Sequence, residues 1–136
     1  MKEIELRETQ DLPREQVLEL YHANRWSSAD KPDALMNHLR KSHTVVTAWQ
    51  AERLIGLGNT LSDGELVAYY SHMLVHPDFH GQGVGTLIAR RLLKRYEGFH
   101  QQVLLAVGPS VRFYEKLGFR PAGETRSMWI FPDEEG

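Results

Sequence analysis

Three glycines at every second position, Gly81, Gly83 and Gly85, have the type and spacing of residues that could bind an anion. They follow an apolar run, Met73 to Val75, and precede a segment with the periodicity of a helix. The first N–H groups of a helix have no partner within it, and the peptide dipoles leave partial positive charge there. Glycine carries no Cβ atom, so a phosphate can lie directly against those donors. The pattern predicts a phosphate-binding loop.

The loop fits neither of two common phosphate-binding patterns. The Walker pattern requires Gly-Lys-Ser/Thr, and this loop contains no lysine, while the dinucleotide pattern spaces its glycines G-x-G-x-x-G. The segment instead resembles the acyl-CoA-binding motif of the GNAT superfamily of N-acyltransferases, Gln/Arg-x-x-Gly-x-Gly/Ala after a Val-x-Pro strand end. Residues 75–77, Val-His-Pro, match the strand end, and residues 80–85 match the loop, with His80 where the family has Gln or Arg.

A second run, FYEKLGF at positions 113–119, resembles the other GNAT signature, in which a helix ends at a glycine before the next strand. Two signatures in this order are together typical of the family. The resemblance implies acetyl-CoA as the cofactor and an amine as the acceptor. It implies that the following residues contact CoA: Leu74, Val75, His80, Gly81, Gln82, Gly83, Val84, Gly85, Thr86, Ser110, Phe113 and Tyr114.

The resemblance also implies catalytic roles. Tyr114 would point its hydroxyl at the CoA sulfur and act as the acid, although position 114 also suits a core tyrosine on an amphipathic helix. The N–H groups of Leu74 and Val75 would stabilise the thioester oxygen. For the base, the strand offers Tyr70, His72 and Glu65, and His72 suits the task best because imidazole titrates near neutrality. A structural histidine is the competing interpretation.

Further expectations concern the acceptor. Tyr70, His72 and Leu74 alternate along one strand and are predicted to share one face. Tyr21, Arg25, Trp26 and Tyr70 are candidates to line the acceptor pocket, although Trp26 could equally fill space beneath a loop. The histidines have no metal-ligand spacing, so no metal is predicted.

The length, charge and composition of the chain limit the partners that it could bind. A chain of 136 residues predicts a single domain over residues 1–136, and a formal charge of −2 argues against nucleic acid as a partner, including charged tRNA. The absence of cysteine excludes disulfides and thiol nucleophiles. No apolar run reaches the ~20 residues of a membrane span, and we expect a cytoplasmic protein. A homodimer is compatible with the family.

The elements that must position these residues alternate along the chain. Strands are predicted near Ile4–Leu6, at 44–49, 54–61, 66–75 and 102–107, near Phe119 and at 125–131, with an acidic tail at 132–136. Helices are predicted after Asp11, after Asp30 and from Val84, and a last one capped by Ser110. Strand 102–107 reads as buried on both faces. The order predicts an α/β fold, the GNAT fold, with a mixed, mostly antiparallel sheet splayed at its centre and helices on both faces.

The sequence thus predicts an N-acetyltransferase that moves an acetyl group from acetyl-CoA to a primary amine by direct attack in a ternary complex. The acceptor would be a small-molecule amine or a peptide amine. The alternative is an acyl-CoA-binding sensor or interaction module with little catalytic activity.

Overall fold

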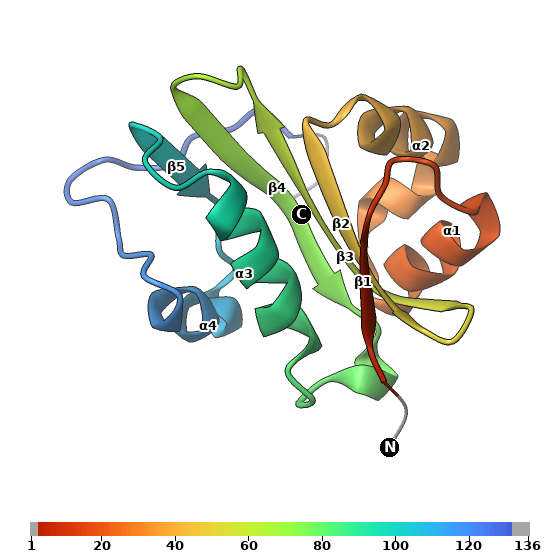
Figure 1. Cartoon of the computed structure of the whole chain (residues 1–136). Coiled ribbons are helices and arrows are strands. Elements are labelled where there is room, and N and C mark those ends of the chain that lie inside the picture. The colour runs from red at the N-terminus through yellow and green to blue at the C-terminus, as the bar shows by residue number, and fades with distance from the viewer. Residues whose placement is uncertain (1–2, 132–136) are drawn as a thin grey trace.

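The computed structural model describes residues 3–131 and contains a five-stranded sheet with helices on both faces (Figure 1). The strands, in their order across the sheet, are β1 (Glu5–Glu8), β2 (Thr44–Gln50), β3 (Arg53–Ser62), β4 (Val67–Val75) and β5 (Gln101–Leu104). Strands β1 to β4 pair antiparallel, and β5 pairs parallel with β4. The predicted mixed, mostly antiparallel sheet is confirmed.

Residues 3–131 also contain four α-helices and three short 3₁₀ turns, of which the last helix and the last turn follow β5. The helices are α1 (Arg14–Ala23), α2 (Pro32–Lys41), α3 (Val84–Arg95) and α4 (Val111–Lys116), and the 3₁₀ turns are η1 (Ser27–Asp30), η2 (Pro77–Phe79) and η3 (Gly108–Ser110). Helices α1 and α2 lie on one face of the sheet, and α3 lies on the other (Figure 1). Each face has its own apolar cluster, one around Leu20, Leu39 and Leu57, the other around Ile88 and Leu92.

Helix α3 packs closely on β3 because two strand positions have no side chain. A Cβ atom at Gly58 would lie 2.8 Å from Ile88 Cγ2 and 2.9 Å from Leu92 Cδ1. One at Gly56 would lie 2.8 Å from Ile88 Cδ1. Since real Cβ contacts are longer, these glycines allow the helix its close approach. The tight packing fixes where the first turn of α3 lies relative to the end of β4.

Strand β4 contains a β-bulge, and because of it the prediction that Tyr70, His72 and Leu74 share one face is wrong. Asn59 pairs with His72 and Thr60 with Tyr70, so Ser71 has no partner on β3. An extra residue of this kind inverts the alternation of side chains along a strand. Tyr70 therefore belongs to the α3-side cluster, whereas Leu74 belongs to the α1–α2 side.

Strands β4 and β5 separate beyond the middle of β4. Their pairing runs from Val67 with Gln101 to Tyr70 with Leu104, and β4 then continues to Val75 without β5. The predicted splay is therefore present. The prediction that 102–107 is buried on both faces is wrong, because β5 is an edge strand that ends at Leu104, and Val103, Leu105 and Val107 are exposed.

The C-terminal region differs from its prediction. The strands predicted near Phe119 and at 125–131 are not formed: residues 118–131 have no regular secondary structure, because nothing in the described chain pairs with them. The predicted acidic tail, 132–136, lies outside the described residues.

The predicted helix ends are confirmed only in part. Neither Asp11 nor Ser110 caps a helix through its side chain; Pro13 stands at the N-cap of α1, and the Ser110 hydroxyl donates instead to the Val107 carbonyl at 2.7 Å. Gly118, predicted to end the last helix, has φ +105°, as that role requires.

Candidate active site

The glycine loop lies between η2 and α3, at the end of β4 that β5 does not reach (Figure 1). Gly81 and Gly83 have φ values of +79° and +82°, in the left-handed region that favours glycine. Within residues 3–131, no atom outside the adjacent backbone lies within 4 Å of where a Cβ of either glycine would stand. The loop backbone is therefore open on the side where side chains would otherwise cover it.

The N-terminus of α3 is free of the groups that usually neutralise a helix end. Within the part of the chain that the structure describes, no side chain caps it, and its first turn contains no acidic residue. Val84 is buried and anchors the turn, and Gly85 lies against Phe113, whose Cζ would be 3.4 Å from a Cβ atom. Because Gly85 has no side chain, Phe113 of α4 can pack against the first turn of α3. The adjacent N–H groups remain available for an anion.

His80 ties the loop to the end of the strand. Its Nε2 lies 2.7 Å from the carbonyl oxygen of Val75, and because that oxygen can only accept, the imidazole donates. His80, which stands where the GNAT motif has Gln or Arg, thus forms a hydrogen bond with the end of β4. Gln82 is exposed and Thr86 is half-buried in the first turn of α3.

Tyr114 and Ser110 come from the other side of the splay. Tyr114 lies on α4 with its ring edge-on to Phe113 and Phe119, at 5.1 and 6.0 Å between centroids. Burial raises the pKa of its phenol, so the hydroxyl remains protonated at neutral pH and able to donate. Ser110 is half-buried just before α4.

On the opposite sheet face, His72 lies in an aromatic cluster. Its Nδ1 is 2.7 Å from the Tyr21 hydroxyl, and its ring is edge-on to Trp26 at 5.1 Å. His38 lies 4.8 Å from it, between ring centroids. Burial, and then the neighbouring His38, lower the pKa of His72 to about 3, so its imidazole is neutral at physiological pH. The structure brings together three of the predicted residues, Tyr21, Trp26 and His72.

The other two acceptor candidates lie elsewhere. Tyr70 points to the α3 side, where its hydroxyl donates to Gln102 Oε1 at 2.6 Å and its ring packs against Tyr96 and Phe119. Arg25 is exposed after α1. Glu65 is exposed at the β3–β4 hairpin. None of these three side chains joins the cluster around His72.

Sequence reasoning missed Asn59 and His38, which support the bulge. Asn59 Oδ1 accepts the backbone N–H of His72 at 2.8 Å, a donor close to the unpaired Ser71. Its Nδ2 donates to Ser42 Oγ at 2.9 Å and lies 3.0 Å from His38 Nε2. An amide inside the apolar run 54–61 was the available signal, because a buried polar group requires partners.

Burial lowers the pKa of His38. Its Nε2 lies 3.1 Å from Ser71 Oγ and faces the Asn59 amide donor, so this nitrogen acts as an acceptor and the ring is neutral with its proton on Nδ1. The imidazole thereby fixes the orientation of Ser71 on the bulge.

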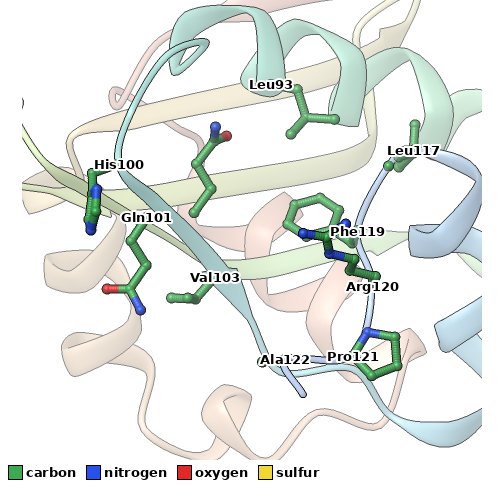
Figure 2. Close-up of a pocket in the computed structure, with 11 residues that line it drawn as sticks. Leu93, His100, Gln101, Val103, Leu117, Phe119, Arg120, Pro121 and Ala122 are labelled. Carbon is green, nitrogen blue, oxygen red and sulfur yellow. The ribbon is translucent and has the colours of Figure 1, made fainter. Parts of the chain in front are cut away.

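Within residues 3–131, no group of three or more histidine, aspartate or glutamate side chains is arranged to hold a metal ion. No helix in this range is long and apolar enough to cross a membrane. A shallow cavity of about 500 Å³ lies between the end of α3, β5 and residues 117–122 (Figure 2). It adjoins the first residues of β5, at the opposite end of the β4–β5 pair from the glycine loop.

Comparisons with known proteins agree with this geometry. Residues 8–129 match the model of the acetyltransferase (GNAT) domain. The fold resembles a GNAT-family acetyltransferase from Streptococcus pneumoniae, with a TM-score of 0.80, 23% identity, and coverage of 96% of this chain and 100% of that one. It also resembles AAC(6')-Iy in complex with a bisubstrate CoA analogue, with a TM-score of 0.72, 14% identity, and coverage of 96% and 99%.

The matched domain defines the class, and the chain belongs to the GNAT acetyltransferase family. In sequence it is 36% identical over 80 residues to ycf52 of Gracilaria tenuistipitata var. liui, described as an uncharacterized N-acetyltransferase. That match covers 56% of this chain and 44% of the relative. The chain spans about half the length of the curated relatives it matches.

Proposed function

We propose that this chain is an acetyl-CoA-dependent N-acetyltransferase, acting as a single domain, that acetylates a small primary amine by direct attack in a ternary complex. The observation that carries the proposal is the open, uncapped N-terminus of α3, preceded by two left-handed glycines, at the end of β4 that β5 does not reach. Family membership supports the same activity.

The residues present fit coenzyme A. The backbone from His80 to Thr86 offers N–H groups to its diphosphate, with no acidic residue in the first turn of α3 to oppose that charge. The edge of β4 beyond Tyr70, left free by β5, offers backbone groups to the pantetheine amides. Phe113 on α4 and Ser110 at the end of η3 would border the site. The bound cofactor would supply the activated acetyl group as a thioester.

The leaving thiolate requires a proton, and Tyr114 is the proposed donor. Its phenol stays protonated because burial raises its pKa. The backbone N–H groups of Leu74 and Val75 are proposed to stabilise the carbonyl oxygen as negative charge develops on it. Val75 directs its N–H group to the edge of β4 that has no β5 partner, whereas that of Leu74 lies on the β3 edge, as does that of His76, which donates to the Ile55 carbonyl at 2.8 Å. Val75 is therefore the better placed of the two.

The acceptor amine must lose a proton, because an alkylamine with a pKa near ~10.4 is mostly charged at neutral pH. We propose that His72 takes part, with Nδ1 donating to the Tyr21 hydroxyl so that Nε2 keeps a lone pair for the amine or an intervening water. The low pKa of His72 keeps its ring neutral but makes it a weak base, so the proton that the amine loses must pass mainly to water. Tyr21 and Trp26 would border the acceptor.

A second candidate function is an acyl-CoA sensor. It is favoured by the position of His72, which is buried, bonded to Tyr21 and poorly basic. Such a protein would bind acetyl-CoA through the same loop and turn over no amine.

The test is release of free CoA thiol from acetyl-CoA across a panel of small amines, aromatic amines and peptide N-termini. We expect steady release with at least one small amine and none without an acceptor. Tight binding of acetyl-CoA with no release across the panel would contradict the transferase and support the sensor. Absence of both binding and release would contradict both.

A further inference from the structure

A second histidine lies beside His72 on the acceptor side of the candidate site. His38 comes from α2, and its ring is 4.8 Å from the ring of His72 between centroids. Its Nε2 lies 3.0 Å from Asn59 Nδ2 and 3.1 Å from Ser71 Oγ. No atom of residues 3–131 forms a hydrogen bond with its Nδ1, and the side chain is only half-buried. His38 therefore has one ring nitrogen available to a ligand.

The main chain determines which nitrogen of His38 carries the proton. The N–H group of His72 donates to Asn59 at 2.8 Å, so the Asn59 atom that faces it is the amide oxygen and the other is the amide nitrogen. That nitrogen can only donate, so His38 Nε2 accepts from it. Burial lowers the pKa of His38 and keeps the ring neutral, so its proton is on Nδ1. The available nitrogen is thus a donor.

His72 provides the complementary group. With its Nδ1 donating to the Tyr21 hydroxyl at 2.7 Å, its Nε2 is an acceptor for the substrate amine. The two imidazoles thus offer one donor and one acceptor from adjacent rings. A substrate that uses both must have a hydrogen-bond-accepting atom close to its amino group. A plain alkylamine has no such atom and would leave the His38 donor unpaired.

The weak basicity of His72 restricts the amine further. Burial, and then His38, lower the pKa of His72 to about 3, so the amine must arrive largely neutral. At pH 7, about a tenth of an α-amine next to a peptide carbonyl, with a pKa near ~7.7–8.0, is neutral, against about one part in 2,500 of an alkylamine with a pKa near ~10.4. A carbonyl on the neighbouring carbon therefore meets both requirements, because it lowers the amine pKa and supplies the accepting oxygen.

We propose, on the basis of the proposed transferase function, that the acceptor is an α-amino carbonyl compound such as an α-amino amide. His38 is its specificity-determining residue and donates from Nδ1 to the carbonyl oxygen, while the amine lies at His72 Nε2. The amine nitrogen bonds to the acetyl carbon, the carbon–sulfur bond breaks, the amine proton passes mainly to water, and the thiolate takes a proton from Tyr114. A free amino acid fits less well, because its carboxylate holds the amine in the charged form.

A series of amines given to the wild-type chain provides the first test, with kcat/KM measured by CoA thiol release and expressed per neutral amine. Glycinamide should exceed both n-propylamine and 2,2,2-trifluoroethylamine at least about tenfold. Trifluoroethylamine is weakly basic but has no oxygen, so it separates basicity from the hydrogen bond. Equal values for glycinamide and trifluoroethylamine would overturn the inference and leave the transferase in place. No release with any amine would overturn both.

Triglycinamide distinguishes the two sources of an α-amino carbonyl group. It carries the same group as glycinamide at the N-terminus of a peptide. Equal kcat/KM values for the two would indicate a small acceptor, and a higher value for triglycinamide would indicate a peptide N-terminus. A value for triglycinamide and glycinamide no higher than that of n-propylamine, per neutral amine, would contradict the assignment of His38.

Variants of His38 provide the second test. His38→Phe should lower the ratio of the glycinamide to the trifluoroethylamine kcat/KM at least about tenfold without changing the KM for acetyl-CoA. His38→Gln, whose amide both accepts and donates, should restore most of that ratio. His100→Phe, at an exposed position beside β5, is the matched control and should keep the wild-type ratio. An equal fall for both amines in His38→Phe would show a purely structural role and overturn the inference.

Discussion

The sheet from β2 to β4 and the region from β5 onward are built differently. Strands β2 and β3 are buried almost throughout, between α1 and α2 on one face and α3 on the other. From residue 101 to 131, by contrast, no residue is fully buried. The candidate CoA site lies at the boundary between the two: β4 and Val84, which anchors the exposed glycine loop, belong to the buried region, and Ser110, Phe113 and Tyr114 come from the exposed one. Stability therefore depends mainly on the buried region, whereas the proposed chemistry uses residues of both.

The largest contrast is expected for valine at two glycines. Gly58→Val in β3 should lower the free energy of unfolding by about 3 kcal/mol, because its side chain would collide with Ile88 and Leu92. Gly108→Val should change it by less than about 0.5 kcal/mol, because no described atom lies within 4 Å of the added Cβ. Urea unfolding followed by circular dichroism measures both. Equal losses would contradict the division into two regions.

Tyr114→Phe tests whether the exposed region supplies chemistry. Turnover should fall roughly 10- to 100-fold, less than many general acids provide, because the thiolate is a good leaving group. The midpoint of thermal unfolding should stay unchanged, since the ring contacts to Phe113 and Phe119 remain. Unchanged turnover would show that Tyr114 has no role in the mechanism. A large loss of stability would show that its hydroxyl serves the packing of α4.

The pH dependence of stability tests the buried side of the site. The pKa of His72 is lowered to about 3 in the folded state and returns to its ordinary value on unfolding. The unfolded chain therefore binds more protons between these values, so stability is present at neutral pH and decreases as the pH falls below about 6.5. Between pH 7 and 5 this group alone should cost about 2 kcal/mol, from ~1.4 kcal/mol per pKa unit.

Urea unfolding at pH 7 and pH 5 measures that loss. His38, whose pKa is lowered by burial and which faces His72, contributes in the same direction. His72→Gln should therefore make the pH dependence shallower without abolishing it. His100→Gln, at an exposed position beside β5, is the matched control and should keep the wild-type profile. An unchanged profile in His72→Gln would show that its imidazole is not held neutral.

The smallest expected effect separates the two ends of α3. Gly83 and Gly98 both have positive φ values, +82° and +85°, with open space where a Cβ would stand. Alanine at either position should cost about 1 kcal/mol of stability through backbone strain. Only Gly83→Ala should weaken CoA binding, by roughly tenfold, because its Cβ would occupy the phosphate-binding face. Equal CoA affinity in both variants, measured by calorimetry, would contradict this location.

The sequence predicted the buried region well because there the local pattern and the burial agree. The helix from Val84, with its stripe of Ile88 and Leu92, was readable from spacing, whereas its packing on the glycines of β3 was found only in the structure. The bulge at Ser71 was not, because it depends on the register between two strands, and it moved Tyr70 to the face opposite the cluster of His72. The position of Asn59 in an apolar run signalled a buried amide that needs partners, but its partners His72 and His38 could not be identified without that register.

The C-terminal predictions failed for a related reason. Residues 125–131 have the composition of a strand, but a strand forms only when another strand pairs with it, and no strand of the described chain pairs with 125–131. The apolar run 103–107 read as a strand buried on both faces, although it continues past the end of β5 at the sheet edge. Both errors concern the strand with which a segment pairs, and a local sequence pattern does not specify that strand.

The most direct test of the central claim is calorimetric titration of the wild-type chain with CoA and, separately, with pantetheine, which shares the thiol arm but lacks the diphosphate and nucleotide. If the α3 N-terminus and the glycine loop grip the diphosphate, CoA should bind with a stoichiometry of one per chain, and pantetheine should bind at least tenfold more weakly, a difference of about 1.4 kcal/mol. No heat with CoA, or equal affinities for the two compounds, would contradict it.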